Sequence, residues 1–159
     1  MGRPRLIIRI ILISSVRIVR FYFFGLNQPG FAGVIDIDSG DEYIFGNDVD
    51  MDDIIWMGPQ PSVKDMAARV GVSKTAPFAR LADCMKTAIS QGRRIHFLPP
   101  YRFRNMLLLE ELLGIRPALV KNYASLELIK AVVDLRSVKE PCEIEEITKA
   151  CNIGYEMHT

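Results

Sequence analysis

A proline-led, glutamate-rich segment most constrains how this chain can fold. It runs from Leu135 to Ile147 with the sequence LRSVKEPCEIEEI. Proline suits the first turn of a helix, and acidic side chains there complement the exposed N–H groups, so a helix is predicted to begin at Pro141. Along that helix Ile144, Ile147 and Cys151 recur at three- and four-residue spacing and form an apolar stripe that must be buried. The few residues after Ile147 offer no partner for this stripe. We therefore expect it to mark the junction with a further domain.

The composition is that of a soluble globular protein of modest size. Of the 159 residues 49% are hydrophobic, and 20 basic side chains against 19 acidic ones give a net charge of +1. This balance does not favour nucleic acid or an anionic membrane as a partner. Cys84, Cys142 and Cys151 are widely spaced and odd in number, which favours reduced structural thiols and a cytoplasmic location.

The first 21 residues differ in style from the rest. The apolar run from Leu6 to Val19 resembles a signal sequence or a membrane span, but Arg9 and Arg17 interrupt it. Each arginine costs roughly 2.5–3.5 kcal/mol on an insertion scale. An edge β-strand rich in isoleucine and valine is an equally weighted alternative. The pattern alone leaves both interpretations open.

Strand and helix patterns alternate through the body of the chain. A β-hairpin is predicted from residues 31–38 and 42–45, and a buried strand from residues 93–98. Ser62 is predicted to cap a short helix that stops at Gly71, and Val72 to begin a short strand. Further helices are predicted at residues 78–91, 103–113 and 125–136. This succession predicts an α/β fold with a layered mixed sheet flanked by helices.

The residues alone do not describe an active site. The acidic loop from Gly46 to Asp53 has four aspartates, but the spacing of an EF-hand loop fails, so a solvated surface is preferred. His96 lies between apolar residues on a predicted strand and is better explained as a hydrogen-bonded core residue than as a catalyst. Neither metal-ligand spacing nor a nucleophile elbow is present in the sequence.

Three motifs follow one another along the chain: FYFFGLNQPGFAGVIDID from Phe21, IIWMGPQPS from Ile54, and ELIKAVVDLRSVKEPCEIEEITKA from Glu127. In that order and spacing they resemble the N-terminal region of Xaa-Pro aminopeptidase (aminopeptidase P), a relative of prolidase and creatinase. The resemblance implies an α/β N-terminal domain of that type at residues 22–136, truncated at both ends. Residues 137–159 would be the linker and the first helix of a pita-bread catalytic domain.

The resemblance also implies a function. The full enzyme of this family removes an N-terminal residue that precedes proline, using water activated by two metal ions, usually manganese, in the pita-bread domain. This chain would then contribute no catalytic residue, no metal ligand and no cofactor, and alone it would be inactive. Its role would be subunit contact and substrate gating in a homo-oligomer that acts on proline-containing peptides. The pita-bread domain would be its main partner, with no nucleic acid and no membrane.

Trp56 is the residue that the resemblance brings closest to the substrate. In aminopeptidase P relatives, the tryptophan of a similar isoleucine-tryptophan motif approaches the active site of a neighbouring subunit. An exposed indole beside Gly58, Pro59 and Pro61 would form a rigid apolar wall for a proline-containing peptide. Packing of Trp56 against its own domain is the equally weighted alternative.

The resemblance leads to a hypothesis about residues 1–21. Codons exist for Ile10–Phe21 whose neighbouring reading frame encodes DNTYIFRQDSSF, the kind of segment that relatives carry before the aromatic run. This anomalous N-terminal segment is therefore predicted to be a frameshift product. Two other functions stay open: a standalone protein-binding module, and an enzyme completed by a separately encoded pita-bread chain.

Overall fold

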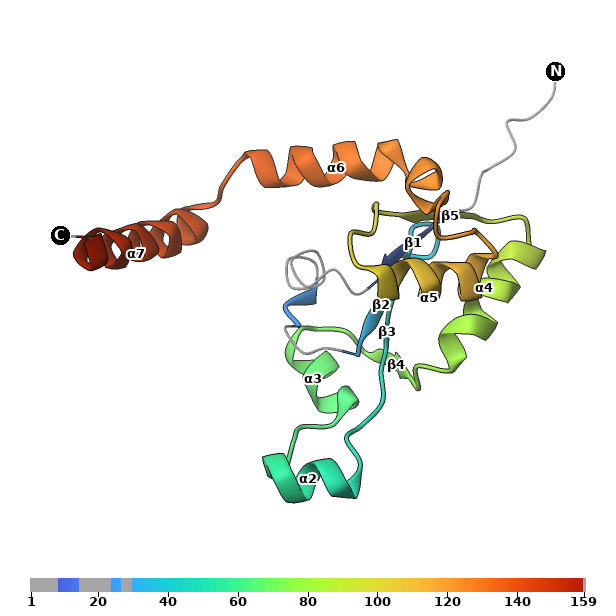
Figure 1. Cartoon of the computed structure of the whole chain (residues 1–159), viewed down its shortest axis with the longest axis horizontal. Helices are drawn as coiled ribbons and strands as arrows, with labels where there is room; N and C mark the ends of the chain where they lie inside the picture. The colour runs from blue at the N-terminus through green and yellow to red at the C-terminus, as the bar shows by residue number, and fades with distance from the viewer. Residues whose placement is uncertain (1–8, 15–23, 27–29, 159) are drawn as a thin grey trace. The chain divides into compact units, whose positions relative to one another are not determined.

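The computed structural model describes residues 9–14, 24–26 and 30–158, with backbone alone for residues 9–14 (Figure 1). The chain divides after Ser125 into two compact units, and each is described by itself. The first unit contains a five-stranded sheet and the helices around it. The second unit consists of two helices.

The sheet of the first unit is mixed, with the strand order β4-β3-β2-β1-β5. Its strands are β1 (Arg9–Ser14), β2 (Ala32–Asp36), β3 (Asp41–Phe45), β4 (Lys74–Ala76) and β5 (Arg94–Phe97). Neighbours β1 and β2, and β2 and β3, are antiparallel, whereas β1 pairs with β5 and β3 with β4 in parallel. The predicted layered mixed sheet is therefore confirmed.

The predicted hairpin is formed by β2 and β3, which join through a tight turn. Asp36 pairs with Asp41, and the carboxylate of Asp36 accepts hydrogen bonds from the backbone N–H groups of Asp38 (3.1 Å) and Ser39 (3.4 Å). An aspartate side chain that accepts from the backbone two residues later is a common turn device. Gly40 has φ +73°, a left-handed conformation that glycine adopts without a steric penalty.

The N-terminal segment contributes a strand, as one of the two interpretations expected. However, β1 lies between β2 and β5 in the interior of the sheet, so the prediction of an edge strand was wrong. A run of β-branched residues suits such a position, because an interior strand is covered on both faces. No helix among the described residues is long and apolar enough to cross a membrane. The rest of residues 1–21, where the frameshift hypothesis applies, lies outside the described residues.

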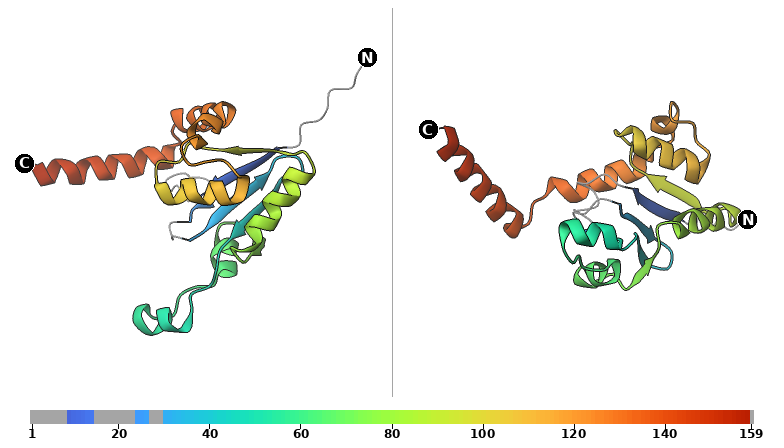
Figure 2. Two further views of the ribbon diagram at one scale, coloured as in Figure 1. Left: turned by 45° about the vertical axis from the view of Figure 1, so that its right-hand side comes forward. Right: turned by 60° about the horizontal axis from the view of Figure 1, so that its bottom comes forward.

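Helices cover both faces of the sheet (Figure 2). One face packs against α4 (Arg80–Ser90), α5 (Phe103–Leu113) and the short 3-10 helix η1 (Val120–Tyr123), and the other against α3 (Val63–Arg69). The side chains between the sheet and α4, α5 and η1 form the first core, and those between the sheet and α3 form the second core. Adjacent residues of β3 alternate between them, because Phe45 belongs to the first core and Ile44 to the second. The predicted helices at residues 78–91 and 103–113 are thereby confirmed. The second of these has the predicted bounds.

The short helix α3 also forms as predicted, with Ser62 as its N-cap. The Ser62 hydroxyl accepts a hydrogen bond from the N–H of Asp65 at 3.1 Å. The prediction that Val72 begins a strand was wrong. Its N–H donates instead to the carbonyl of Ala67 (3.0 Å) and closes the end of the helix around Gly71, so β4 starts only at Lys74.

The second unit consists of α6 (Leu126–Ser137) and α7 (Pro141–His158). As predicted, α7 begins at the proline, and the carboxylate of Glu143 accepts a hydrogen bond from the N–H of Glu140 at 2.9 Å. None of the described residues of α7 is buried. Ile144, Ile147 and Cys151, the predicted stripe, are all exposed.

One ion pair joins the hairpin turn to the start of β5. Arg93 donates to Asp36 and, at 3.3 Å, to Asp38. Burial alone raises the pKa of Asp36. The hydrogen bond from Arg93, those from the backbone of Asp38 and Ser39, and the attraction to Arg93 together outweigh burial, so the pKa lies below its usual value. Because β1 lies between β2 and β5, this pair fastens the two strands that flank it.

Replacing Arg93 by methionine is expected to lower the free energy of unfolding by about 2 kcal/mol at pH 7, because Asp36 would remain mostly buried without its cation. The pKa of Asp36 is lower in the folded state, so its contribution is present above the unfolded pKa of about 3.9 and is lost as the pH falls further. Urea unfolding at pH 7 and at pH 3 should therefore show that the difference in free energy of unfolding between the variant and wild type is smaller at pH 3.

Arg80→Met is the matched control for this prediction. The Arg80–Asp83 side chains are 71% and 63% exposed, against 14% and 16% for Arg93 and Asp36. Exposed pairs contribute about 1 kcal/mol at most. If the difference in free energy of unfolding between Arg93→Met and wild type is the same at pH 7 and pH 3, the assigned role of Asp36 is contradicted.

Candidate functional site

A short helix, α2 (Met51–Met57), stands at the end of an excursion between β3 and α3, which we name the α2 arm (residues 47–61). From the sequence, only a solvated acidic loop was predicted at Gly46–Asp53. Asp50 is the N-cap, and its carboxylate accepts a hydrogen bond from the N–H of Asp53 at 2.8 Å. Gly58 ends the helix with φ +77°, and its N–H donates to the carbonyl of Ile54 at 2.8 Å. An aspartate cap followed by acidic residues was the sequence signal for this missed helix.

The base of the α2 arm is fastened to the first unit by two side chains of the acidic loop. The carboxylate of Asp48 accepts from the N–H of Val63 at 2.6 Å, and the side-chain carbonyl of Asn47 accepts from the N–H of Phe78 at 3.0 Å. The N–H of Gly46 donates to the carbonyl of Ala76 at 3.0 Å. The arm therefore departs from a defined point of the sheet.

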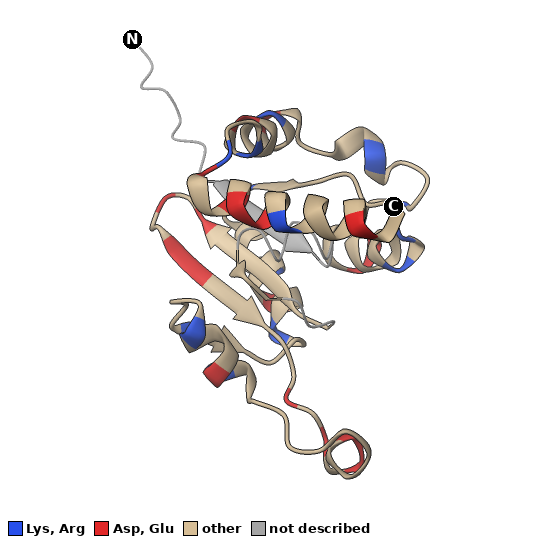
Figure 3. Cartoon of the chain, turned by 90° about the vertical axis from the view of Figure 1, so that its left-hand side faces the viewer, with Lys and Arg blue, Asp and Glu red and all other residues tan. Residues whose placement is uncertain are grey.

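Trp56 lies on α2 and is 87% exposed. Almost none of its side chain is therefore covered by the described residues. Among these residues the structure does not show the alternative, in which Trp56 packs against its own domain. Met51, Ile55 and Met57 on the same helix are also exposed. Residues 46–62 contain no lysine or arginine, and Figure 3 shows only acidic charge on α2. The arm thus presents an apolar surface bordered by negative charge.

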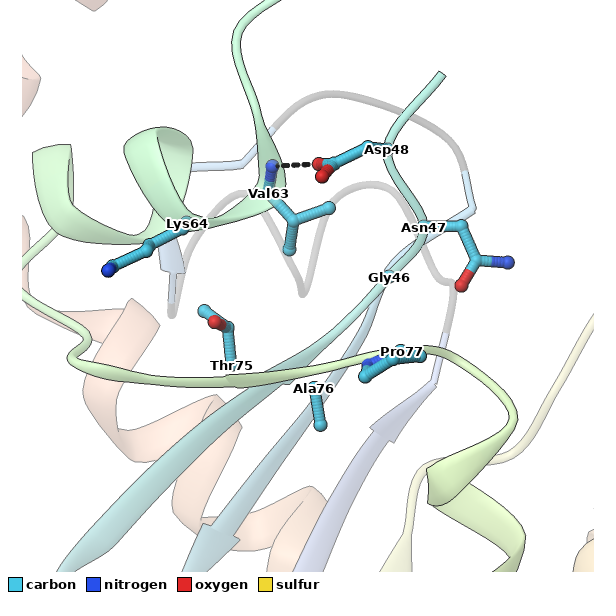
Figure 4. Close-up of a pocket in the computed structure, with 8 residues that line it drawn as sticks. All are labelled: Gly46, Asn47, Asp48, Val63, Lys64, Thr75, Ala76 and Pro77. Atoms are coloured by element: carbon cyan, nitrogen blue, oxygen red, sulfur yellow. Dashed lines mark hydrogen bonds between the residues drawn. The ribbon is translucent and has the colours of Figure 1, made fainter. Parts of the chain in front are cut away.

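A cavity of about 250 Å³ lies at the base of the arm, at the carboxyl ends of the parallel strands β3 and β4 (Figure 4). It is lined by Gly46, Asn47, Asp48, Val63, Lys64, Thr75, Ala76 and Pro77. Such ends are the usual place for ligands in α/β sheets. Here, however, Asp48 is used by the N–H of Val63, as the dashed line in Figure 4 shows. The cavity therefore lies beneath the loop that this hydrogen bond anchors, and Asp48 already has a backbone partner there.

The described residues do not fit a dinuclear manganese site. No group of three or more histidine, cysteine, aspartate or glutamate side chains among them could hold a metal ion. In the acidic loop, Asp48 binds the N–H of Val63 and Asp50 caps α2, so both carboxylates serve the backbone. All four aspartates of the loop are exposed, as a solvated acidic surface requires.

His96 is a core residue on β5. It is buried, and its Nδ1 lies 2.6 Å from the hydroxyl oxygen of Ser125, which is also buried. The N–H of Ser125 in turn donates to the carbonyl of Phe97 at 3.0 Å. These contacts attach the end of the first unit to β5 and agree with a structural histidine. Neither member of the pair is accessible to a substrate.

Cys84 has the properties of a structural thiol. It packs against the first core, and burial raises its pKa, an effect that Asp36 reinforces and Arg93 only partly opposes. A raised pKa lowers the fraction of thiolate, which is the reactive form. Cys142 and Cys151 are exposed on α7, and all three cysteines are free thiols.

Residues 20–96 match the model of the family described as aminopeptidase P, N-terminal domain. The matched segment contains the whole α2 arm, strands β2, β3 and β4, and β5 as far as His96. No curated protein matches the chain.

Proposed function

We propose that this chain, whose residues 20–96 match the aminopeptidase P N-terminal domain, is the non-catalytic N-terminal part of a metal-dependent Xaa-Pro aminopeptidase. In the complete enzyme this part makes subunit contacts and gates short peptides, and a pita-bread domain with two manganese ions cleaves the bond before proline. The alternative is a standalone protein-binding module derived from such a domain.

The observation that carries this proposal is the position of Trp56. An indole held almost entirely in solvent on a helix between Asp50 and Gly58 is poorly explained by the stability of its own fold. Pro59 and Pro61 follow the helix and restrict the backbone there. A rigid, flat, apolar side chain of this kind suits contact with the ring of a proline.

The exposed stripe of α7 supports the link to a catalytic domain. Ile144, Ile147 and Cys151 recur at helical spacing, and none is buried. A stripe of this kind packs against another element in a folded protein. A pita-bread domain that follows α7 or is separately encoded would supply that element.

The pure chain with added manganese is expected to release no first residue from an Xaa-Pro peptide, because in this proposal the pita-bread domain supplies the metal ligands. Release of free amino acid can be followed by chromatography over a range of manganese concentrations. Metal-dependent turnover by pure material would overturn the proposal that this chain is non-catalytic.

The same assay, repeated with a separately produced pita-bread chain of this family, tests gating. Trp56→Ala is then expected to raise the KM for an Xaa-Pro peptide roughly three- to tenfold, the scale of a lost aromatic contact. Ile55→Ala, on the same exposed helix, is the matched control and should leave the KM unchanged. If adding this chain alters neither the rate nor the KM, the binding module is the better explanation.

A further inference from the structure

We infer that the open edge of β4 and the cavity beside it bind the carboxyl-terminal end of a short peptide in an extended conformation. The inference rests on the peptide-gating part of the proposed function and names the end of the peptide that the base of the α2 arm recognises. It follows from a strand edge, a cavity on the same face of the sheet, and an exposed lysine at the rim of that cavity.

The strand β4 forms an edge of the described sheet and pairs with β3 on one side only. The carbonyl of Ala76 accepts a hydrogen bond from the N–H of Gly46 at 3.0 Å, so the main-chain groups of Ala76 face β3. Successive residues of a strand point these groups in opposite directions, so the N–H and carbonyl of Thr75 face outwards. Thr75 is partly exposed, and no described residue shares a hydrogen bond with its main chain. An open edge of this kind accepts a further extended segment.

The cavity of about 250 Å³ lies beside this edge. Thr75 is in register with Ile44 of the second core and so shares the face of the sheet that α3 covers, and Val63 of α3 lines the cavity there. A peptide side chain that lies beside Thr75 therefore enters the cavity, against Val63 and Pro77. The volume is smaller than that of sites for drug-sized ligands, about 300–1,000 Å³, and suits one apolar side chain.

A basic side chain lies at the rim of the cavity. Lys64 lines it, is exposed, and forms no ion pair with a described residue. Figure 4 shows Lys64 on the Thr75 side of the cavity, away from Asp48, whose carboxylate is already used by the N–H of Val63. A peptide carboxylate that arrives beside Thr75 is therefore attracted to the ammonium of Lys64.

These features fit a peptide that runs antiparallel to β4 with its last residue opposite Thr75. Such a pair exchanges both main-chain hydrogen bonds, so the peptide N–H donates to the carbonyl of Thr75 and the peptide carboxylate accepts from its N–H. In Figure 4 the strand runs from Thr75 to Pro77 away from Lys64, so the carboxyl end of an antiparallel peptide lies toward the lysine. The three residues of β4 limit the pairing to a short segment.

Titration of the isotope-labelled full chain, followed by nuclear magnetic resonance, tests this mode with matched peptides. The probes are Ala-Pro-Leu with a free carboxylate, the same peptide with a carboxyl-terminal amide, and Ala-Pro-Gly. Ala-Pro-Leu is expected to shift the amide signals of Val63, Thr75 and Ala76, with a Kd of roughly 1 mM. The amide-capped peptide should bind roughly fivefold more weakly, the scale of an exposed ion pair. Ala-Pro-Gly should also bind more weakly, because it has no side chain to fill the cavity.

Two pairs of variants separate the main-chain contact from the charge. Thr75→Pro removes the outward N–H, which an edge strand tolerates, and should weaken binding of Ala-Pro-Leu roughly tenfold. Thr75→Val keeps the main chain and should leave binding unchanged. Lys64→Glu should abolish the preference for the free carboxylate over the amide, whereas Lys86→Glu, at an exposed lysine of α4, should retain it. An unchanged amide signal of Leu109 in the first core shows that a variant is folded.

Several outcomes would overturn the inference. They are the absence of shifts at β4 and α3, equal binding of the free and amide-capped peptides by wild type, and a Lys64→Glu variant that keeps the preference for the carboxylate. Undiminished binding by folded Thr75→Pro would do the same, and if that variant does not fold, the peptide pair and Lys64→Glu decide. No catalytic domain is present in these titrations. Failure of the peptidase proposal therefore leaves them unchanged, and failure here leaves the peptidase assay unchanged.

Discussion

Leu109→Ala is expected to lower the free energy of unfolding by about 2–5 kcal/mol, the largest effect of any single substitution proposed for this chain. Leu109 lies on α5, is 1% exposed, and belongs to the first core with Leu81, Met85 and Val120. Truncation removes buried methyl groups and leaves a cavity that the fully buried neighbours cannot fill without moving. Urea unfolding followed by circular dichroism measures the loss.

Leu107→Ala is the control on the same helix. Leu107 is 44% exposed, so the same chemical change removes little buried surface. Its effect should stay within about 1 kcal/mol, because alanine also favours the helix. Hydrogen exchange can assign the loss to the first unit, since α5 and β5 amides should lose protection while α7 amides do not. Equal losses in the two variants would contradict the assignment of Leu109 to the core.

Local signals predicted most of the elements correctly. The end of α5 was predicted correctly because Gly114 follows the helix. Its φ of +69° is the left-handed conformation that favours glycine at the end of a helix. The hairpin was predicted from apolar and polar residues that alternate on either side of the turn at Gly40. The N-cap of α3 was predicted from Ser62 and Asp65, which are three residues apart. In each case the residues that decide the structure are within a few positions of one another.

Elements that depend on distant contacts were predicted less well. The interior position of β1 depends on its pairing with β2 on one side and β5 on the other, which no local pattern specifies. The prediction that a strand starts at Val72 was wrong because the N–H of this residue donates to the carbonyl of Ala67 at the end of α3. The helix α2 was missed because Ile54, Ile55 and Trp56 are consecutive, so no helical stripe is visible in a helix that buries nothing.

The same distinction applies to the candidate site. The motif that contains Trp56 was visible in the sequence, and so was the acidic character of the arm. The exposure of the indole was not, because it depends on how far the arm stands from the sheet. The anchors at Asn47 and Asp48 were not visible either, since their hydrogen-bond partners lie 31 and 15 residues away.

Gly46→Ala is expected to destabilise the first unit by about 1–3 kcal/mol and to loosen the base of the α2 arm. A Cβ atom at this position would lie 2.1 Å from Cδ1 and 2.2 Å from Cε1 of Phe31. Phe31 is buried in the second core and cannot swing into solvent. The backbone of Gly46 must therefore shift, and it carries with it the adjacent anchors Asn47 and Asp48. Thermal unfolding measures the stability, and hydrogen exchange at Val63 and Phe78 reports the two anchoring bonds.

A double-mutant cycle with Phe31→Leu separates this steric effect from any other cost of Gly46→Ala. Leucine removes the overlapping ring atoms, so alanine at position 46 should cost much less in that background, and the two changes should couple by more than about 0.5 kcal/mol. Gly40→Ala is the contrasting control. Gly40 has φ +73°, and a Cβ atom added there would meet no neighbouring atom within 4 Å. The cost of Gly40→Ala, about 1 kcal/mol, therefore comes from the backbone conformation alone and should be independent of Phe31. Additive effects of Gly46→Ala and Phe31→Leu would show that the ring does not set the requirement for glycine at the base of the arm.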